Sequence, residues 1–110
     1  MPQDRILSMI GLAKRAGMIT SGAQQCEKNI RTGKAQLIII AKDISDNGRK
    51  AITDSCRHYS VKYIEYSDMY TLGSAIGSQG VRTVISVNDK NFADAVLTKY
   101  AASETGRNGE

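Results

Sequence analysis

One continuous apolar run constrains the fold more than any other feature of this sequence. Residues 36–41 read Gln-Leu-Ile-Ile-Ile-Ala, and residues 37–41 form the longest purely apolar stretch of the 110-residue chain. Such a run is too short for a transmembrane span or for the apolar segment of a secretory signal, so we expect a cytoplasmic protein without membrane contact. A short run rich in β-branched residues favours a strand covered on both faces.

Helix and strand patterns alternate around this run. Helices are predicted over residues 4–17, 22–33, 46–59, 68–76 and 89–100, a turn over residues 77–80, and further strands over residues 18–21, 61–66 and 81–87. This alternation indicates an α/β sandwich with helices on both faces of a small sheet. We predict one domain over residues 1–100 and a polar, frayed tail over residues 101–110.

Positive charge is concentrated in the first half of the chain. Residues 1–50 hold nine Lys or Arg and four Asp or Glu, a net of +5, whereas residues 51–110 hold six and seven, a net of −1. Between residues 14 and 34 the basic residues are Lys14, Arg15, Lys28, Arg31 and Lys34, and the single acid is Glu27. Such a surplus attracts polyanions, although solvation of two helices explains the charge alone equally well.

The residues that could support catalysis or metal binding are few. Cys26, Cys56 and His58 are too few for a Cys/His zinc site, and neither dinucleotide nor phosphate-binding glycine motifs occur. Both cysteines fall on apolar helix stripes, the second together with Ile52 and Tyr59, and are predicted to be core residues, with His58 exposed. Asp43 follows a strand, where a loop or capping role is favoured over that of a phospho-acceptor or metal ligand.

Part of the surplus positive charge falls on one face of the second predicted helix. Gln24, Lys28 and Arg31 share the face opposite the small residues, and Gln25 lies beside them in the first turn. At a helix start, free N–H groups favour a phosphate, and Gly22 permits close approach. Glutamine amides can pair with base edges while the basic side chains reach phosphates. A solvated helix face is the alternative that periodicity leaves open.

Several short motifs, in order, resemble one known family. They are Gly11-Leu-Ala-Lys-Arg-Ala-Gly17, Ser21-Gly22, Ile30-Arg31-Thr32-Gly33-Lys34-Ala35, Ala41-Lys42-Asp43 and Leu72-Gly73-Ser74-Ala75-Ile76-Gly77. Their order and spacing resemble the kink-turn-binding ribosomal protein family of the L7Ae type, over nearly the whole chain. The resemblance implies a three-layer α/β/α sandwich with a mixed sheet, no catalysis, no cofactor, and binding of sharply bent RNA.

The resemblance also assigns candidate RNA contacts. The family motif Gly-x-Asn-Glu-x-x-Lys corresponds to Gly22, Ala23, Gln24, Gln25 and Lys28, so that two amides replace an amide and a carboxylate. The family's apolar loop after the fourth helix corresponds to residues 78–80, which read Ser-Gln-Gly. The further candidate contacts are Lys14, Arg15, Arg31, Lys34, Lys42, Gln79, Gly80, Val81 and Arg82.

The sequence therefore predicts a non-catalytic, ribosome- or ribonucleoprotein-associated protein that binds structured RNA, acts as a monomer and holds no metal. The alternative is a protein–protein interaction module on the same fold, whose RNA surface has drifted. An exposed apolar patch would mark that alternative.

Overall fold

A four-stranded mixed sheet forms the middle layer of the computed structural model, which describes residues 4–108. The strand order is β1-β4-β2-β3. β1 (Ile19–Ser21), β2 (Leu37–Ile40) and β3 (Lys62–Glu65) run in one direction, and β4 (Val84–Val87) runs antiparallel to its neighbours β1 and β2. β2 is an inner strand whose four residues are all buried, which confirms the prediction of a central, doubly covered strand.

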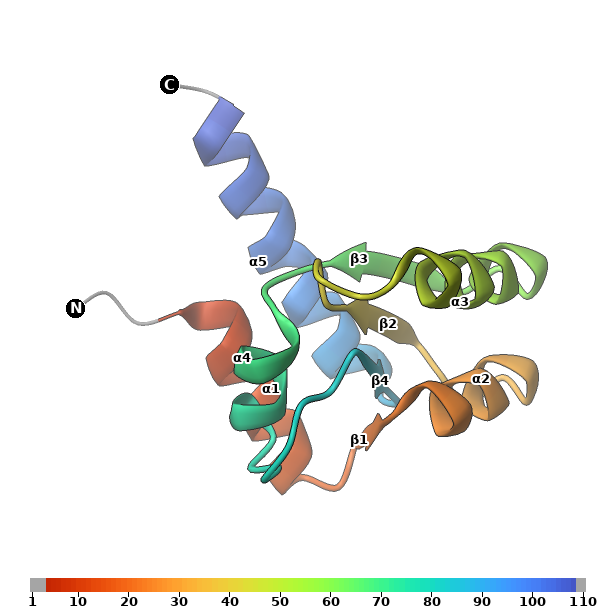
Figure 1. Cartoon of the computed structure of the whole chain (residues 1–110). Helices are drawn as coiled ribbons and strands as arrows, with labels where there is room; N and C mark the ends of the chain where they lie inside the picture. The colour runs from red at the N-terminus through yellow and green to blue at the C-terminus, as the bar shows by residue number, and fades with distance from the viewer. Residues whose placement is uncertain (1–3, 109–110) are drawn as a thin grey trace.

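Helices cover both faces of the sheet (Figure 1). α1 (Arg5–Arg15), α4 (Met69–Ala75) and α5 (Lys90–Asn108) lie on one face, and α2 (Ala23–Arg31) and α3 (Asp46–His58) lie on the other. The three-layer α/β/α fold is therefore confirmed.

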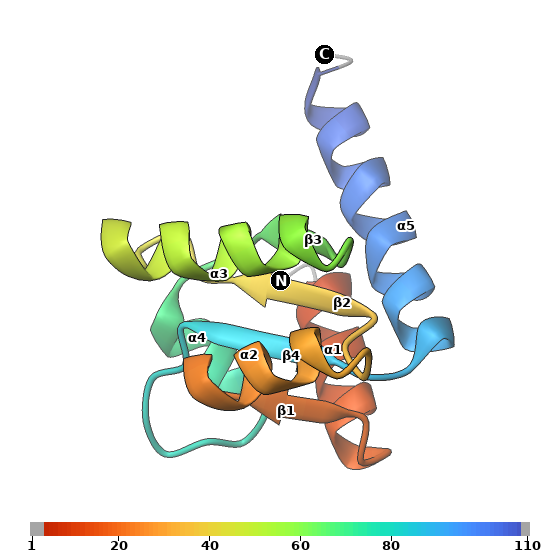
Figure 2. The same cartoon turned by 90° about the vertical axis from the view of Figure 1, so that its right-hand side faces the viewer.

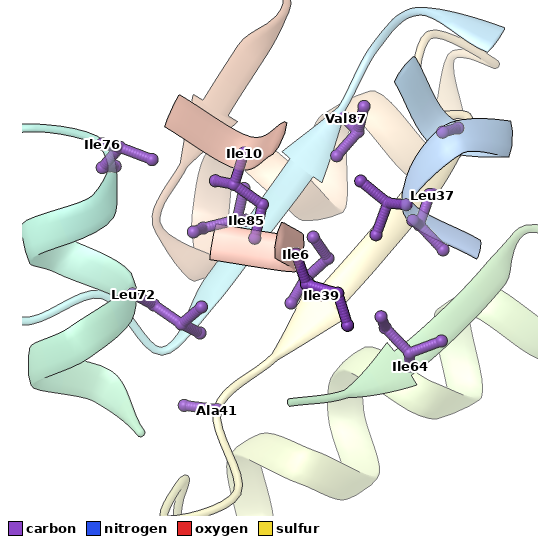
Figure 3. Close-up of a cluster of buried hydrophobic side chains, with 12 residues drawn as sticks. Ile6, Ile10, Leu37, Ile39, Ala41, Ile64, Leu72, Ile76, Ile85 and Val87 are labelled. Atoms are coloured by element: carbon purple, nitrogen blue, oxygen red, sulfur yellow. The ribbon is translucent and has the colours of Figure 1, made fainter. Parts of the chain in front are cut away.

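Alternation along β2 divides the core into two apolar clusters. Leu37 and Ile39 face α1, α4 and α5, whereas Ile38 and Ile40 face α2 and α3. Figure 3 shows the first cluster, in which Ile6 of α1 reaches the sheet next to Ile39. Full burial of such a side chain contributes about 1.5–3 kcal/mol, so each face holds its helices firmly.

Two element boundaries differ from the prediction by three residues or more. α5 continues to Asn108, where the sequence predicts a frayed tail, because Ala101 and Ala102 have the highest helix propensity and no glycine interrupts α5 before Gly106. Residues 109–110 of that tail lie outside the described residues. β4 begins at Val84 rather than at residue 81, because residues 81–83 belong to the loop from α4.

The inward face of α3 also differs from the prediction. Tyr59 was expected on the apolar stripe but is 44% exposed at the C-cap of the helix. Thr53 is buried instead, and its hydroxyl donates a hydrogen bond to the Arg49 carbonyl at 2.8 Å. This bond satisfies the buried hydroxyl, so a polar residue is accepted on the inner face.

The segments around the sheet fall into two groups, which lie at opposite ends in Figure 2. At the carboxyl end, where β1, β2 and β3 finish, lie the start of α2, the segments after β2 and β3, and the α4–β4 loop. At the amino end, where these strands begin, lie the last turn of α1, the α2–β2 and α3–β3 turns, and the start of α5. Residues that are close in sequence can therefore lie on separate surfaces.

Candidate nucleic-acid interface

The start of α2 differs from the other helix starts in the described chain. Asp4, Ser45, Asp68 and Asp89 cap α1, α3, α4 and α5, each by accepting a hydrogen bond from a first-turn N–H. The N-cap of α2 is Gly22, which makes no side-chain cap and has a φ of 95°, a conformation that glycine adopts without strain. The first N–H groups of α2 therefore lack a side-chain acceptor and suit an anion.

The α4–β4 loop lies beside this helix start. Arg82 donates a hydrogen bond from Nε to Ser21 Oγ at 3.0 Å, and the Gly22 N–H donates to the Val84 carbonyl at 3.0 Å. The structure thus places two separated candidate segments, residues 22–25 and residues 79–82, at the carboxyl end of the sheet.

Gly73 determines how closely this loop folds back onto α4. A Cβ atom at Gly73 would overlap the carbonyl oxygen of Gly80, and it would also press on the Val81 backbone. The Ser78 N–H donates to the Gly73 carbonyl at 2.9 Å, which holds the other side of the loop. The sequence shows Gly73 only as part of a motif, since its partner is a backbone atom that no sequence pattern reveals.

The outward face of α2 carries groups of two kinds. Gln24, Gln25 and Lys28 are exposed, and within the described residues their side chains make no hydrogen bond or ion pair. Arg31, in contrast, lies 2.7 Å from Glu27, measured from Nε to Oε1. The hydroxyl of Ser55 in α3 also donates to Glu27, and this bond, followed by that from Arg31, lowers the pKa of the Glu27 carboxyl. The acid of this segment therefore offsets Arg31 and leaves Lys28 unpaired.

A buried polar network holds α2 against the sheet. The Asn29 amide donates to Asn88 Oδ1 at 3.3 Å, and the Ser86 hydroxyl donates to the same oxygen at 2.6 Å. The Asn88 amide in turn donates to Thr20 Oγ1 at 2.9 Å. The sequence assigns Asn88 only to a helix cap with Asp89 and assigns no role to Asn29, Ser86 or Thr20. The available signal was an asparagine on the otherwise apolar face of Cys26 and Ile30. The network fixes the helix on whose outer face the candidate residues lie.

The segment after β2 adds one exposed cation to the carboxyl end. The Lys42 N–H donates to the Ser67 carbonyl, and the Lys42 carbonyl accepts from Arg49, both at 2.8 Å. Its backbone is therefore held while its side chain is exposed. Asp43 accepts a hydrogen bond from the Met69 N–H at 3.0 Å, which agrees with the capping role that the sequence favours.

Four of the predicted contacts lie elsewhere. Lys14 and Arg15 end α1, just before β1, Arg31 ends α2, and Lys34 lies in the turn before β2. The sequence counts all four as RNA contacts together with the start of α2, but the structure separates them from that helix start. Strand direction puts them at the amino end of the sheet, whereas Gly22 lies at the carboxyl end.

The two thiols belong to the core. Cys26 and Cys56 are buried and free. Burial, followed by the charge of the other thiol, raises the pKa of Cys26 to about 12, and burial, followed by the charge of Glu27, raises that of Cys56 to about 11. His58 is exposed, as predicted. Within residues 4–108, no cluster of three His, Cys, Asp or Glu side chains is placed to hold a metal ion.

This arrangement has counterparts among known proteins. The profile of the Ribosomal protein L7Ae/L30e/S12e/Gadd45 family matches residues 4–96. The chain belongs to this family. As a family member it is 36% identical over 90 residues to the RNA-binding protein YlxQ of Bacillus subtilis, covering 82% of this chain and 89% of that protein. The RNA-binding protein YlxQ of Enterococcus faecium is 31% identical over 91 residues, covering 83% and 86%.

Solved structures of the family fold agree with this assignment. A protein with unknown function from Bacillus halodurans superposes with a TM-score of 0.84 at 30% identity, covering 88% of this chain and 97% of that one. The Giardia lamblia 15.5kD RNA binding protein has the same fold, with a TM-score of 0.76 at 21% identity, covering 96% and 92%. The L7Ae family and its YlxQ members are non-enzymatic, which confirms the prediction of a protein without catalytic activity. Among the described residues, no helix is both long and apolar enough to cross a membrane.

Proposed function

We propose that this chain is a non-catalytic protein that binds sharply bent, kink-turn-like RNA at the carboxyl end of its sheet. The observation that carries the proposal is the junction of the α2 start with the α4–β4 loop, through Arg82 to Ser21 and Gly22 to Val84. Family membership and the names of the YlxQ relatives support an RNA partner. We further propose that the chain acts as a monomer within ribosomal or other ribonucleoprotein particles of the cytoplasm.

The proposed mechanism combines an anion site with base contacts. Apart from Gly22 and its two chain neighbours, nothing lies within 4 Å of a Cβ position at Gly22, so an RNA backbone can approach the free N–H groups of α2. Lys28 and Lys42 neutralise nearby phosphates, which releases counterions. Gln24 and Gln25 supply amides for paired hydrogen bonds to base edges at the bend.

The residues that differ from the family motif determine which RNA groups this site would recognise. Glu27 is held by Arg31 and Ser55, so it does not replace the carboxylate that the family places where Gln25 stands. Val81 is 37% exposed and offers an apolar contact beside Gly80 in the loop. We propose that amide groups and loop shape together select the bent RNA.

The test is a titration of the full chain with a kink-turn RNA and with a fully paired control of equal charge, each at two salt concentrations. We expect tighter binding of the kinked RNA at both salts, with a log–log salt slope of about −3 to −4 for about four phosphate contacts. Equal, weak and salt-labile binding of both RNAs would contradict kink-turn recognition. Absence of binding at low salt would contradict RNA binding altogether.

A groove between α1 and α4 supports a second candidate function, that of a protein–protein interaction module. Its volume is about 570 Å³, and Leu12 on its wall is 45% exposed. Leu7 and Ala75 add apolar surface, whereas Arg15 and Ser74 make it partly polar. A chain that binds neither RNA in the titration would favour this candidate.

A further inference from the structure

A surface groove of about 400 Å³ opens at the amino end of the sheet, away from the site proposed above. It lies between the α2–β2 turn, the α3–β3 turn and the first turns of α5, and its wall includes Gln36, Tyr59, Lys62, Lys90 and Leu97. Its volume falls within the range of about 300–1,000 Å³ found for small-molecule and cofactor sites. The groove is therefore large enough for one nucleotide.

The backbone around Tyr59 leaves its ring at the surface. Tyr59 is the C-cap of α3, and Ser60 follows with a φ of 59°, so the chain turns into β3 immediately after the ring. The His58 ring meets Tyr59 edge-on at a centroid distance of 4.6 Å, which supports the aromatic ring in place. Tyr59 is 44% exposed and offers an aromatic face to the groove, whose lining also includes the partly buried Leu97. A base stacks on such a face regardless of its identity.

Two lysines, Lys62 and Lys90, and one carboxylate, Asp94, line this groove, so the basic side chains outnumber the acidic one. Lys62 is exposed, and Lys34 lies in the turn between two groove residues, Gly33 and Ala35. Lys90 pairs with Asp94 at 2.9 Å, but both side chains are more than half exposed, and such surface pairs are worth little. Lys90 is therefore available to a stronger anionic partner. Lys14 and Arg15 extend the positive surface at the same end of the sheet.

An aromatic face, an exposed amide and a lysine rim together match the three parts of a nucleotide. The base would stack on Tyr59, its edge would meet the Gln36 amide, and phosphates on either side would meet Lys62 and Lys90. We propose that this groove is a second RNA site, which binds an unpaired nucleotide of single-stranded RNA. The site goes beyond the kinked-RNA function and does not depend on it. Because the two surfaces lie at opposite ends of the sheet, one protein molecule can bind a kinked RNA and a single-stranded RNA at the same time.

The direct test follows a labelled, unstructured RNA oligonucleotide by anisotropy, with and without saturating unlabelled kink-turn RNA. The proposal requires that the oligonucleotide still binds when the carboxyl end is occupied. Complete displacement by the kinked RNA would overturn it, as would failure of the oligonucleotide to bind at low salt. Loss of the preference for kinked over paired RNA would contradict the first function and leave this result unaffected.

Variants of Tyr59 test the stacking contact. Tyr59→Ala should weaken oligonucleotide binding by about 5- to 100-fold, while Tyr59→Phe retains it. The chain contains no tryptophan, so Tyr59→Trp introduces a single tryptophan at the groove, whose emission can be excited selectively over that of the remaining tyrosines. Its emission should be quenched by the unpaired oligonucleotide and not by a paired duplex. An unchanged emission in the presence of bound oligonucleotide would overturn the assignment.

A matched pair of lysines tests the phosphate contacts. Lys90 and Lys50 each pair with an aspartate four residues later at 2.9 Å, with side chains 76% and 78% exposed, but only Lys90 lines the groove. Lys90→Gln should reduce the salt slope of oligonucleotide binding by about 0.7, and Lys50→Gln should not. Equal effects of the two variants would overturn the site. If polyglutamate displaced the oligonucleotide as well as unlabelled RNA does, the proposal would also be overturned. The groove would then bind polyanions without a base contact, or would bind an acidic protein instead of RNA.

Discussion

The two ends of the sheet offer RNA different kinds of groups. The carboxyl end presents the free N–H groups of α2, two glutamine amides and the α4–β4 loop, which packs closely on α4 because residue 73 is glycine. Its flanking cations are Lys42, Arg49 and Arg82, set among Asp43, Asp46, Glu65 and Asp68. At the amino end the flanking cations are Lys14, Arg15, Arg31, Lys34, Arg57, Lys62 and Lys90, and the flanking acids of the described residues include Asp89 and Asp94.

The contrast separates geometry from charge. Recognition at the carboxyl end depends on how α2 and the α4–β4 loop are held together, since the hydrogen-bond donors must keep fixed positions. Attraction at the amino end depends on a sum of exposed charges, each of which can be removed without moving the backbone. Changes in packing should therefore affect the first surface most, and changes in charge the second.

Alkaline pH should abolish both surfaces together, because Cys26 and Cys56 lie in the core under α2 and α3. In the unfolded chain these thiols ionise near a pKa of 9.0, but folded they stay protonated to about 12 and about 11. Both pKa values are raised, so the stability that they contribute is present below pH 9 and is lost as the pH rises toward 11. The free energy of unfolding should fall by up to about 1.4 kcal/mol per pH unit for each thiol.

Urea denaturation followed by circular dichroism, from neutral pH to about pH 11, measures this loss. The control is the double variant Cys26→Ala/Cys56→Ala, which should be less stable at neutral pH and depend less on alkaline pH. An identical alkaline dependence of variant and wild type would show that other groups cause the loss.

Gly73→Ala should break the carboxyl end alone. The added methyl group would overlap the Gly80 carbonyl, so the loop must move away from α4. Overpacking of this kind costs about 1–3 kcal/mol of stability, and we expect a loss of about tenfold or more in kinked-RNA affinity. Binding of the unpaired oligonucleotide should not change. Ser74→Ala, at the exposed neighbouring position on α4, is the control, and equal losses for both variants would show that α4 and not the loop is responsible.

The sequence predicted best those features that depend on neighbouring residues. The apolar run of β2 identified the central strand, because five successive apolar residues can be buried only between two layers. The sequence predicts caps at Asp4, at Ser67 or Asp68, and at Asn88-Asp89, since a cap and the N–H from which it accepts lie three residues apart. In the structure Asp4, Asp68 and Asp89 accept these hydrogen bonds. Features that depend only on residues close in sequence can be predicted directly from it.

Features that depend on strand direction could not be predicted in the same way. Lys14 and Lys34 flank the α2 segment in sequence, but the order in which β1 and β2 run places them at the far end of the sheet from Gly22. Tyr59 has helical spacing with Cys56, yet it lies where α3 has already ended. Periodicity identifies which residues share a face, but not where a helix stops or which end of the sheet it meets.

Gln25→Ala should reduce discrimination at the carboxyl end more than affinity. A paired hydrogen bond to a base edge contributes about 1–3 kcal/mol of discrimination, so the ratio of kinked to paired RNA affinity should fall by about 5- to 100-fold. Gln36→Ala is the matched control, because Gln36 is an exposed glutamine at the amino end. It should leave that ratio unchanged and weaken the unpaired oligonucleotide instead. A ratio unaltered by Gln25→Ala would remove this amide from the site.

The smallest effects should come from replacing single lysines, one on α2 and one in the turn that follows it. Lys28→Ala removes one phosphate contact of the kinked RNA, so its affinity should fall a few-fold and its salt slope should become less steep by about 0.9, with oligonucleotide binding unchanged. Lys34→Ala should leave the kinked RNA unaffected and reduce the oligonucleotide slope by about 0.7. Both side chains are exposed, so neither change should alter the unfolding midpoint. If each variant weakened both RNAs equally, the positive charge would act as one field over the whole domain, and the division into two surfaces would fail.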